Sequence, residues 1–339
     1  MFAPTARRQL AVALAVASSS LFLAACSSGD GGGGSTEASG EGFPVTIANT
    51  FGSTTLDAAP ERIVTLGWNA QDVVYALGQT PVGMPKYTYG AEANGVMPWL
   101  QDRFDPSATT LLDAATSTSI EGVAALAPDV VLAPYEGFDE ATYEKLSGIA
   151  PTVAYPDKAW QTTWQDQTAL VGQALGKSAE AEQLVAGLDD TLAQTAAAHP
   201  EFAGKTISVV NFDTDAATVN VYMPSDPRVQ VLTELGFTVS PGVQKLAAAN
   251  DPDKFFADIS VENISDVDAD VVVAFVPENT TVAANPAYAN LGAIGRGTAV
   301  ALSDTKIISG LSQTSVLATP WVLDKLTPQL SEAAKKAGA

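Results

Sequence analysis

The sequence predicts an α/β protein of two similar lobes with mostly parallel sheets, joined by a single long α-helix. Three observations predict it: apolar β-branched runs that alternate with helix-like segments, an internal repeat, and a proline-free helical stretch between the two copies. A chain of 339 residues has room for about two domains. With 46% hydrophobic and 16% charged residues, it is expected to fold as a packed globular protein.

The predicted strands are short apolar runs bounded by Pro, Gly or Asp. They cover residues 62–67, 81–84, 129–134, 151–155, 206–211, 269–275 and 305–309. Helix-like segments lie between several of them, at 69–77, 119–127 and 138–150. Nearly continuous apolar strands that alternate with helices are typical of parallel sheets covered on both faces.

An internal repeat is the most informative feature. SIEGVAALAPDVVLA at 119–133 and SVENISDVDADVVVA at 260–274 align without gaps and share Ser, Glu, Asp, Val, Val and Ala. A shorter echo precedes each copy, at 75–82 and 233–240. Each copy reads as a helix start followed by a buried strand, so we expect two related lobes. The first has a longer gap between echo and copy, which predicts an inserted loop within residues 90–104.

A long helix is predicted between the lobes. The stretch from Asp157 to His199 has no proline, and Gly176-Lys177-Ser178 divides it into helices at 161–175 and 178–199. In the second helix Ala181, Leu184/Val185, Leu188 and Leu192 recur at helical spacing, with Ser178 as a candidate N-cap and Pro200 after the end. The segment GQALGKS resembles a phosphate-binding loop but is one residue short between its glycines, which favours a helix–helix joint.

The N-terminus has the order of a secretory signal: Arg7-Arg8, an apolar run, then Leu23-Ala24-Ala25-Cys26, which resembles a lipobox. We therefore expect a lipoprotein signal peptide at 1–25, lipidation of Cys26, and a protein anchored by lipid on the extracytoplasmic face of the cell membrane. An ordinary secretory signal with a chance cysteine is the alternative, and the export route, Sec or twin-arginine, stays open. Residues 26–43 are rich in Gly and Ser and predict a flexible tether. The expected lobes are 44–177 and 200–339, with the linker helix at 178–199.

Composition removes several classes of function. Lys and Arg number 17 against 38 Asp and Glu, a net charge of −21, which disfavours nucleic acid as a partner. One Cys and one His leave no intrachain disulfide and no zinc site rich in those residues. Residues 310–314 lack the second glycine of a nucleophile elbow, and His199, the sole candidate base, sits at a helix end. A lipid-anchored α/β hydrolase is the alternative from another class, although the sequence offers it no evident nucleophile and base.

Several motifs in order carry a family resemblance. They are PERIV at 60–64, ALGQTPVGM at 76–84, KLSGIAPTVAY at 145–155, LTELGF at 232–237 and the two repeat copies. With them the chain resembles the substrate-binding lipoproteins of iron-siderophore ABC importers, a class that also contains cobalamin and haem binders. The resemblance implies two Rossmann-like lobes, no catalytic residue, no cofactor, a Fe(III)-siderophore as ligand, an ABC permease in the membrane as partner, and a monomer. A cobalamin or haem binder of the same class is the alternative.

Two glutamates occupy the same place in the repeat. The resemblance implies that Glu121 and Glu262, one in each lobe, dock onto arginines of the two permease subunits. The residues themselves allow a simpler role, because a glutamate near a helix N-terminus complements the helix dipole.

Ligand contacts are expected at the carboxyl ends of the predicted strands, where open α/β sheets bind their ligands. Aromatic faces suit the organic shell of a ferric chelate, and cations suit its oxygen donors. The candidates are Trp68, Lys86, Tyr87, Tyr135 and Trp160 in the first lobe, Tyr222, Arg228 and Phe275 in the second, and Trp99 and Arg103 as lid contacts from the inserted loop. For the aromatic residues core packing is the alternative, and for Arg228 the alternative is a surface ion pair or an arginine at a helix start. We expect no directly bound metal, because a single histidine cannot supply the imidazoles of a zinc or manganese site.

Overall fold

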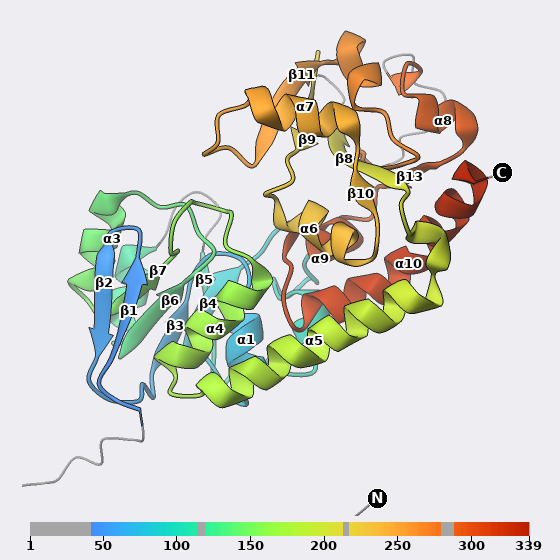
Figure 1. Ribbon diagram of the computed structural model, residues 1–339. Coiled ribbons are helices and arrows are strands. Elements are labelled where there is room, and N and C mark those ends of the chain that lie inside the picture. The colour runs from blue at the N-terminus through green and yellow to red at the C-terminus, as the bar shows by residue number, and fades with distance from the viewer. Residues whose placement is uncertain (1–41, 114–118, 213–216, 279–287, 339) are drawn as a thin grey trace, which may run out of the picture. The chain divides into compact units, whose positions relative to one another are not determined.

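Two β-sheets, each with helices packed against it, carry the two halves of the chain in the computed structural model (Figure 1). The structure describes residues 42–113, 119–212, 217–278 and 288–338, which all belong to one unit formed by residues 39–339. The predicted signal peptide, Cys26 and nearly all of the predicted tether lie outside these ranges. Among the described helices, none combines the length and the apolar character needed to cross a membrane.

The first sheet is entirely parallel, with five strands in the order β5-β4-β3-β6-β7. Its strands are β3 (Ile63–Thr65), β4 (Gly83–Lys86), β5 (Thr110–Asp113), β6 (Val130–Ala133) and β7 (Thr152–Ala154). The helices of this half are α1 (Ala70–Ala76), α2 (Ile120–Ala125), α3 (Glu140–Ser147) and the short 3₁₀ helix η1 (Pro98–Leu100). Every residue of β3, β6 and β7 is buried, as expected of strands covered on both faces.

An antiparallel hairpin that the sequence pattern did not predict precedes this sheet. It consists of β1 (Val45–Asn49) and β2 (Gly52–Leu56). The Thr50 N–H donates to the carbonyl of Tyr155, and the Thr54 hydroxyl donates to that of Thr152. The hairpin thus covers the edge of the sheet formed by β7.

The second sheet is mixed, in the order β11-β9-β8-β12-β13, with β10 also paired to β8. Its strands are β8 (Thr206–Phe212), β9 (Thr218–Tyr222), β10 (Thr238–Val239), β11 (Phe256–Ser260), β12 (Val271–Phe275) and β13 (Ala299–Leu302). The helices are α6 (Pro227–Glu234), α7 (Pro241–Ala249), α8 (Gly292–Arg296) and the 3₁₀ helix η3 (Val261–Val267). Strands β10 and β12 pair with β8 in parallel, and β13 pairs with β12 in parallel. Strand β9 pairs with both β8 and β11 in antiparallel orientation. The predicted α/β class with mostly parallel sheets is confirmed.

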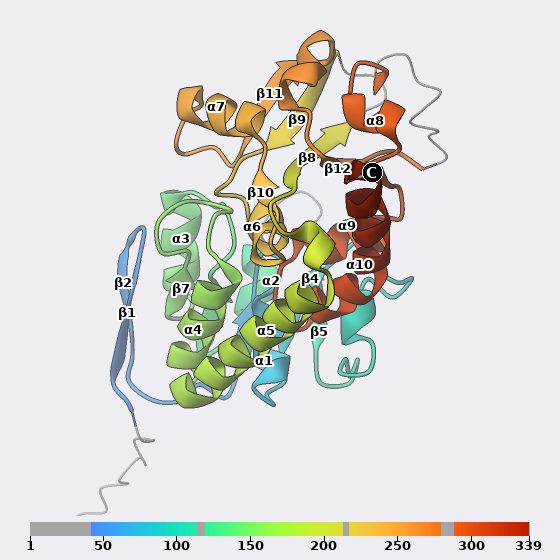
Figure 2. The same cartoon turned by 45° about the vertical axis from the view of Figure 1, so that its right-hand side comes forward.

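The stretch between the sheets forms the two predicted helices, α4 (Trp164–Ala174) and α5 (Ser178–Ala198), and a short 3₁₀ helix, η2 (Pro200–Phe202), follows. In both views α5 extends from the side of the first sheet towards the second (Figure 1 and Figure 2). Helices α4 and α5 meet closely, since a Cβ on Gly172 would lie 2.3 Å from Cβ of Ala181. Ser178 is the first helical residue and not the N-cap, a position that Lys177 occupies without a side-chain hydrogen bond.

The predicted strand at 305–309 is wrong. These residues begin the helix α9 (Thr305–Ser312), which is followed by α10 (Ala318–Ala337). The carboxylate of Asp304 accepts a hydrogen bond from the Lys306 N–H and caps the helix. Ile308 and Leu311 are buried three residues apart, a helical spacing that the short apolar run concealed.

The shared residues of the repeat make equivalent contacts in the two halves. Ser119 caps α2 by accepting from the Gly122 N–H, and Ser260 accepts from the Glu262 N–H at the start of η3. The identical Val, Val and Ala lie in the buried strands β6 and β12. The repeat therefore preserves both the helix start and the strand that follows it.

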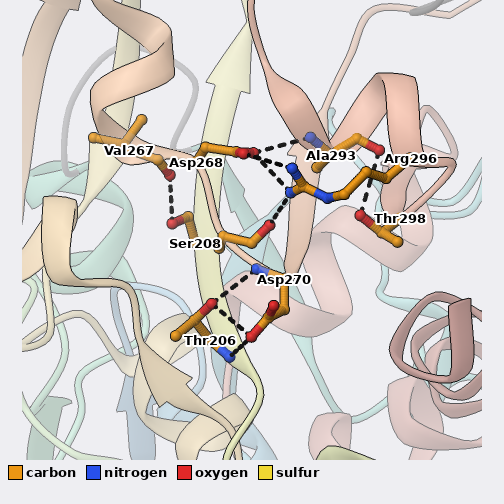
Figure 3. A network of polar contacts seen from close by, with 9 residues as sticks. Thr206, Ser208, Val267, Asp268, Asp270, Ala293, Arg296 and Thr298 are labelled. Atoms are coloured by element: carbon orange, nitrogen blue, oxygen red, sulfur yellow. Dashed lines mark hydrogen bonds and ion pairs between the residues drawn. The ribbon is translucent and has the colours of Figure 1, made fainter. Parts of the chain in front are cut away.

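The shared aspartate of the repeat fixes the start of the central strand in each half. The carboxylate of Asp129 accepts from the N–H groups of Glu61 and Arg62, just before β3. Asp270 accepts from the N–H and the hydroxyl of Thr206, the first residue of β8, at 2.8 and 2.9 Å (Figure 3). Figure 3 also shows Arg296 donating to Asp268, which ties α8 to the start of β12.

One hydrophobic cluster reaches from one half to the other. It contains Ile63 and Val130 of the first sheet, Leu188 and Leu192 of α5, and Val271 of the second sheet. Because α5 contributes buried side chains to this shared core, it connects the two halves as a rigid, packed helix.

Candidate ligand-binding site

A pocket of about 870 Å³ lies at the carboxyl ends of the strands of the first sheet. It is lined by the last residues of β4 and β5 and by residues that follow β3, β4 and β6, which is the edge where parallel α/β sheets bind ligands. Ser309, Ser312 and Gln313, at the end of α9, form a wall from the second half of the chain. A volume of this size is in the range of small-molecule sites.

Two indole rings and a phenol ring pack together at one side of the pocket. Trp68 and Trp160 line it, with ring centroids 5.6 Å apart, and Tyr135 lies behind them, 5.6 Å from Trp160 and 6.3 Å from Trp68. Tyr135 is 2% exposed, and burial raises the pKa of its hydroxyl above the ordinary value. The pocket is therefore lined by two indole side chains that pack against a third, buried ring.

The backbone at this aromatic wall leaves no room for larger side chains. Trp160 has φ +61°, in the left-handed region that residues other than glycine rarely adopt. A Cβ on Gly137 would lie 2.1 Å from Nε1 of Trp160. Gly67 has φ +76°, and a Cβ there would lie 2.2 Å from the carbonyl oxygen of Tyr135. Both glycines are thus required for the rings to sit where they do.

Tyr87 lines the pocket and holds the turn after β3. Its hydroxyl oxygen lies 2.7 Å from the carbonyl oxygen of Gly67 and 2.8 Å from that of Trp68, and it accepts from the Gln71 amide at 3.2 Å. Burial raises the pKa of Tyr87 well above its ordinary value. The hydroxyl is therefore a donor to the backbone and is not set up to ligate a metal as a phenolate.

Charges of both signs border the pocket. Lys86 and Lys145 are exposed at its rim, and Glu136, Asp139 and Asp113 supply carboxylates. Burial raises the pKa of Glu136, although its carboxylate accepts from the Gly137 N–H at 3.0 Å. Hydrogen bonds from Thr142 lower the pKa of Asp139, which caps α3.

The candidates of the second half lie together but outside this pocket lining. Arg228 is 5% exposed; its guanidinium carbon lies 4.0 Å from the ring centroid of Tyr222, and its Nε donates to Asp226 at 2.9 Å. Phe275 is buried, 5.8 Å from Tyr222 between ring centroids. The charges of Asp226 and Arg228 act on the pKa of Tyr135, so this cluster lies within electrostatic reach of that ring.

The two candidates of the inserted loop also lie away from the pocket lining. The indole N–H of Trp99 donates to Asp72 at 2.7 Å, and its ring packs on Trp321 with centroids 5.4 Å apart. Arg103 is exposed beyond η1, within reach of the charge of Asp72. The contacts of Trp99 therefore hold the inserted loop against α1 and α10.

Asp72 is the centre of a polar contact between α1 and the segment that joins α9 to α10. Its carboxylate accepts from the Ser315 hydroxyl at 2.5 Å, and the Asn69 amide donates to the Thr314 carbonyl at 2.6 Å. Burial raises the pKa of Asp72 to about 7. Sequence reasoning missed this contact, because nothing in the pattern of 69–77 relates it to residues more than two hundred positions away.

Other lining residues were missed for identifiable reasons. Lys145 and Asp139 belong to α3, which was predicted as a helix without a role in binding. Glu136 directly follows the candidate Tyr135 and could have been included by its place after the strand. Ser309 was out of reach because residues 305–309 were assigned to a strand, and Ser312 and Gln313 lie in residues 310–314, which were considered only as a nucleophile elbow and rejected.

A two-sheet α/β scaffold with an aromatic, charge-lined pocket at the strand ends defines a binding protein that holds a small molecule. The chain belongs to the periplasmic binding protein family, whose model matches residues 63–303. The predicted resemblance is confirmed. Proteins of this family bind substrates for transport, so the expectation that the chain is not an enzyme is confirmed as well.

Similar proteins support the same class. The probable siderophore-binding lipoprotein YfiY of Bacillus subtilis is 30% identical over 242 residues, 70% of each chain. The ferric enterobactin-binding periplasmic protein FepB of Escherichia coli is 26% identical over 206 residues, 58% of this chain and 63% of FepB.

A cobalamin-binding protein of Halobacterium salinarum is 27% identical over 285 residues, 78% of this chain and 69% of its own. Among solved structures, Streptococcus pneumoniae PiaA in complex with ferrichrome superposes with a TM-score of 0.79 at 29% identity, over 86% of this chain and 99% of PiaA.

Proposed function

We propose that this protein captures a ferric siderophore outside the cytoplasmic membrane and delivers it to an ABC permease. The observation that carries the proposal is the 870 Å³ pocket with its two indole side chains, lysines and carboxylates at the strand ends. Indole faces cover the apolar chain of an iron chelate, and the few polar groups orient it. Relatives that are siderophore-binding proteins support the same ligand class.

The proposal includes a lipid anchor at Cys26, after removal of residues 1–25. Its support is the lipobox-like Leu23-Ala24-Ala25-Cys26 and the lipoprotein named among the relatives. The tether would let the folded body stand off from the membrane surface and reach the permease.

Tryptophan fluorescence tests the ligand directly. Two of the five tryptophans, Trp68 and Trp160, line the pocket. A coloured ferric siderophore is expected to quench the emission saturably at submicromolar concentration. Replacing both residues by Phe should remove most of the quenching, while Trp321→Phe, on α10, should keep it. Flat titrations with ferric siderophores would refute the proposal, and saturable quenching by cobalamin alone would favour the alternative that the Halobacterium relative suggests.

The aromatic wall should be sensitive to a single methyl group. Gly137→Ala places a Cβ against the Trp160 ring, so the ring must move, and the affinity for the ferric siderophore is expected to fall by at least about tenfold, as when a buried aromatic anchor is lost. Isothermal titration calorimetry measures the loss. Gly187→Ala is the matched control, because its Cβ meets nothing within 4 Å in α5. Equal affinities for the Gly137→Ala variant and the unmodified protein would show that the ring position does not matter.

A further inference from the structure

The charges at the pocket bear on which ferric complexes it can accept. Lys86 and Lys145 face a lining that also contains the carboxylates of Glu136 and Asp139. The two lysines are therefore matched by these two acids, and Asp113 adds a further carboxylate to the lining. The described lining has no excess of positive charge to receive an anionic ligand.

The arginines of the described ranges do not supply the missing charge. Arg228 is bound to Asp226, Arg296 to Asp268, and Arg62 to the backbone carbonyl of Ala127. None of these side chains lines the pocket, nor does Arg103. An anionic chelate would lack the bidentate guanidinium donors that recognise clustered oxygen anions best.

The common iron-binding groups differ in the charge they leave on the complex. Three hydroxamates, each with a single negative charge, neutralise Fe(III), whereas three catecholates, each doubly negative, leave a triply negative complex. A triply negative shell would gain no net attraction from a lining in which Glu136 and Asp139 balance the two lysines, and its repulsion by the half-buried Glu136 would be stronger than in water. A neutral shell does not depend on this balance, and an ammonium group on the ligand can pair locally with the carboxylate of Glu136 or Asp139.

Building on the proposed function, we infer that the pocket takes neutral or cationic tris-hydroxamate complexes of Fe(III) and discriminates against triply negative tris-catecholate complexes. The indoles of Trp68 and Trp160 contact the methylene chain of the chelate, and the carboxylates of Glu136 and Asp139 set the preferred charge.

A series of chelates that all bind iron through three hydroxamates, and that differ in the charge of a terminal group, isolates the effect of charge. The series is a linear ferric tris-hydroxamate with a free terminal amine, its neutral N-acetyl form and its anionic N-succinyl form, compared with a ferric tris-catecholate by calorimetry and fluorescence. Each unit of negative charge is expected to weaken binding by about threefold or more at low salt, and less at high salt. The tris-catecholate is expected to bind at least about tenfold more weakly than the neutral hydroxamate. A tris-catecholate that binds as tightly as the hydroxamates would overturn the inference.

Two substitutions of opposite sign test the residues. Glu136→Gln should reduce the ratio of affinities for the amine and N-succinyl forms, and Lys145→Gln should increase it, because each removes one rim charge. An unchanged ratio in both variants would overturn the assignment. If none of the four complexes binds, the proposed function itself fails, whereas tight binding with the tris-catecholate preferred refutes the charge selection and leaves the proposed function in place.

Discussion

Replacing Glu121 and Glu262 together by Ala is expected to leave the affinity for the ferric siderophore within about twofold while reducing uptake by at least about tenfold, because losing two charged contacts at an interface costs several kcal/mol. Both glutamates are exposed. Each lies in the first turn of a helix that follows a strand ending at the carboxyl edge of its sheet, β5 for Glu121 and β11 for Glu262. A permease that contacts both lobes with arginines would find one carboxylate on each.

The control separates docking from general loss of surface charge. Glu140, in the first turn of α3, and Asp266, in η3, are exposed acids of the same two lobes. Their double replacement by Ala removes the same net charge and should leave uptake unchanged. Uptake of radioactive iron and titration of the purified proteins are measured in parallel. Similar uptake by the two double variants, whether high or low, would refute the hypothesis that Glu121 and Glu262 dock onto the permease.

The repeat made much of the architecture predictable. Its shared residues are those with a fixed structural role, namely a serine at a helix start, an aspartate that holds the first residues of a central strand, and apolar residues of a buried strand. Each role depends on neighbours within one α/β unit, so two copies reveal it. The glutamates have no such local role beyond the helix start, and their shared position is what supports a partner.

Contacts between distant segments could not be predicted in the same way. Sequence reasoning placed Trp68, Lys86, Tyr87 and Trp160 at the strand ends, and these four residues line the pocket. It could not tell that Trp99 donates its N–H to Asp72, or that the end of α9 closes the pocket from the other half. Residues 305–309 of α9 were predicted as a strand because two adjacent isoleucines are compatible with the spacing of apolar residues in a strand and with that in a helix. Only the burial of both Ile308 and Leu311 decides between the two.

Asp72→Asn is expected to stabilise the protein at pH 8 and to have little effect near pH 4. Burial raises the pKa of this carboxyl from 3.8 to about 7, so the folded state favours the protonated form more than the unfolded state does. A raised acid pKa means that folding takes up a proton between these two values. The unmodified protein therefore loses stability as the pH rises from about 4 to about 7, and the loss is complete above that range.

The size of this loss follows from the shift of about three pKa units, which corresponds to roughly 4 kcal/mol as an upper bound at pH 8. An asparagine carbonyl in place of the carboxylate can still accept from the Ser315 hydroxyl and the Trp99 indole, so the contact between α1 and the segment before α10 is kept without a buried charge. Urea unfolding at pH 4 and pH 8 measures the difference in the free energy of unfolding, with Asp102→Asn, at an exposed site of the loop that carries Trp99, as control. A variant that is less stable than the unmodified protein at pH 8 would mean that the ionised carboxylate, with Arg103 nearby, strengthens the contact between the two halves of the chain.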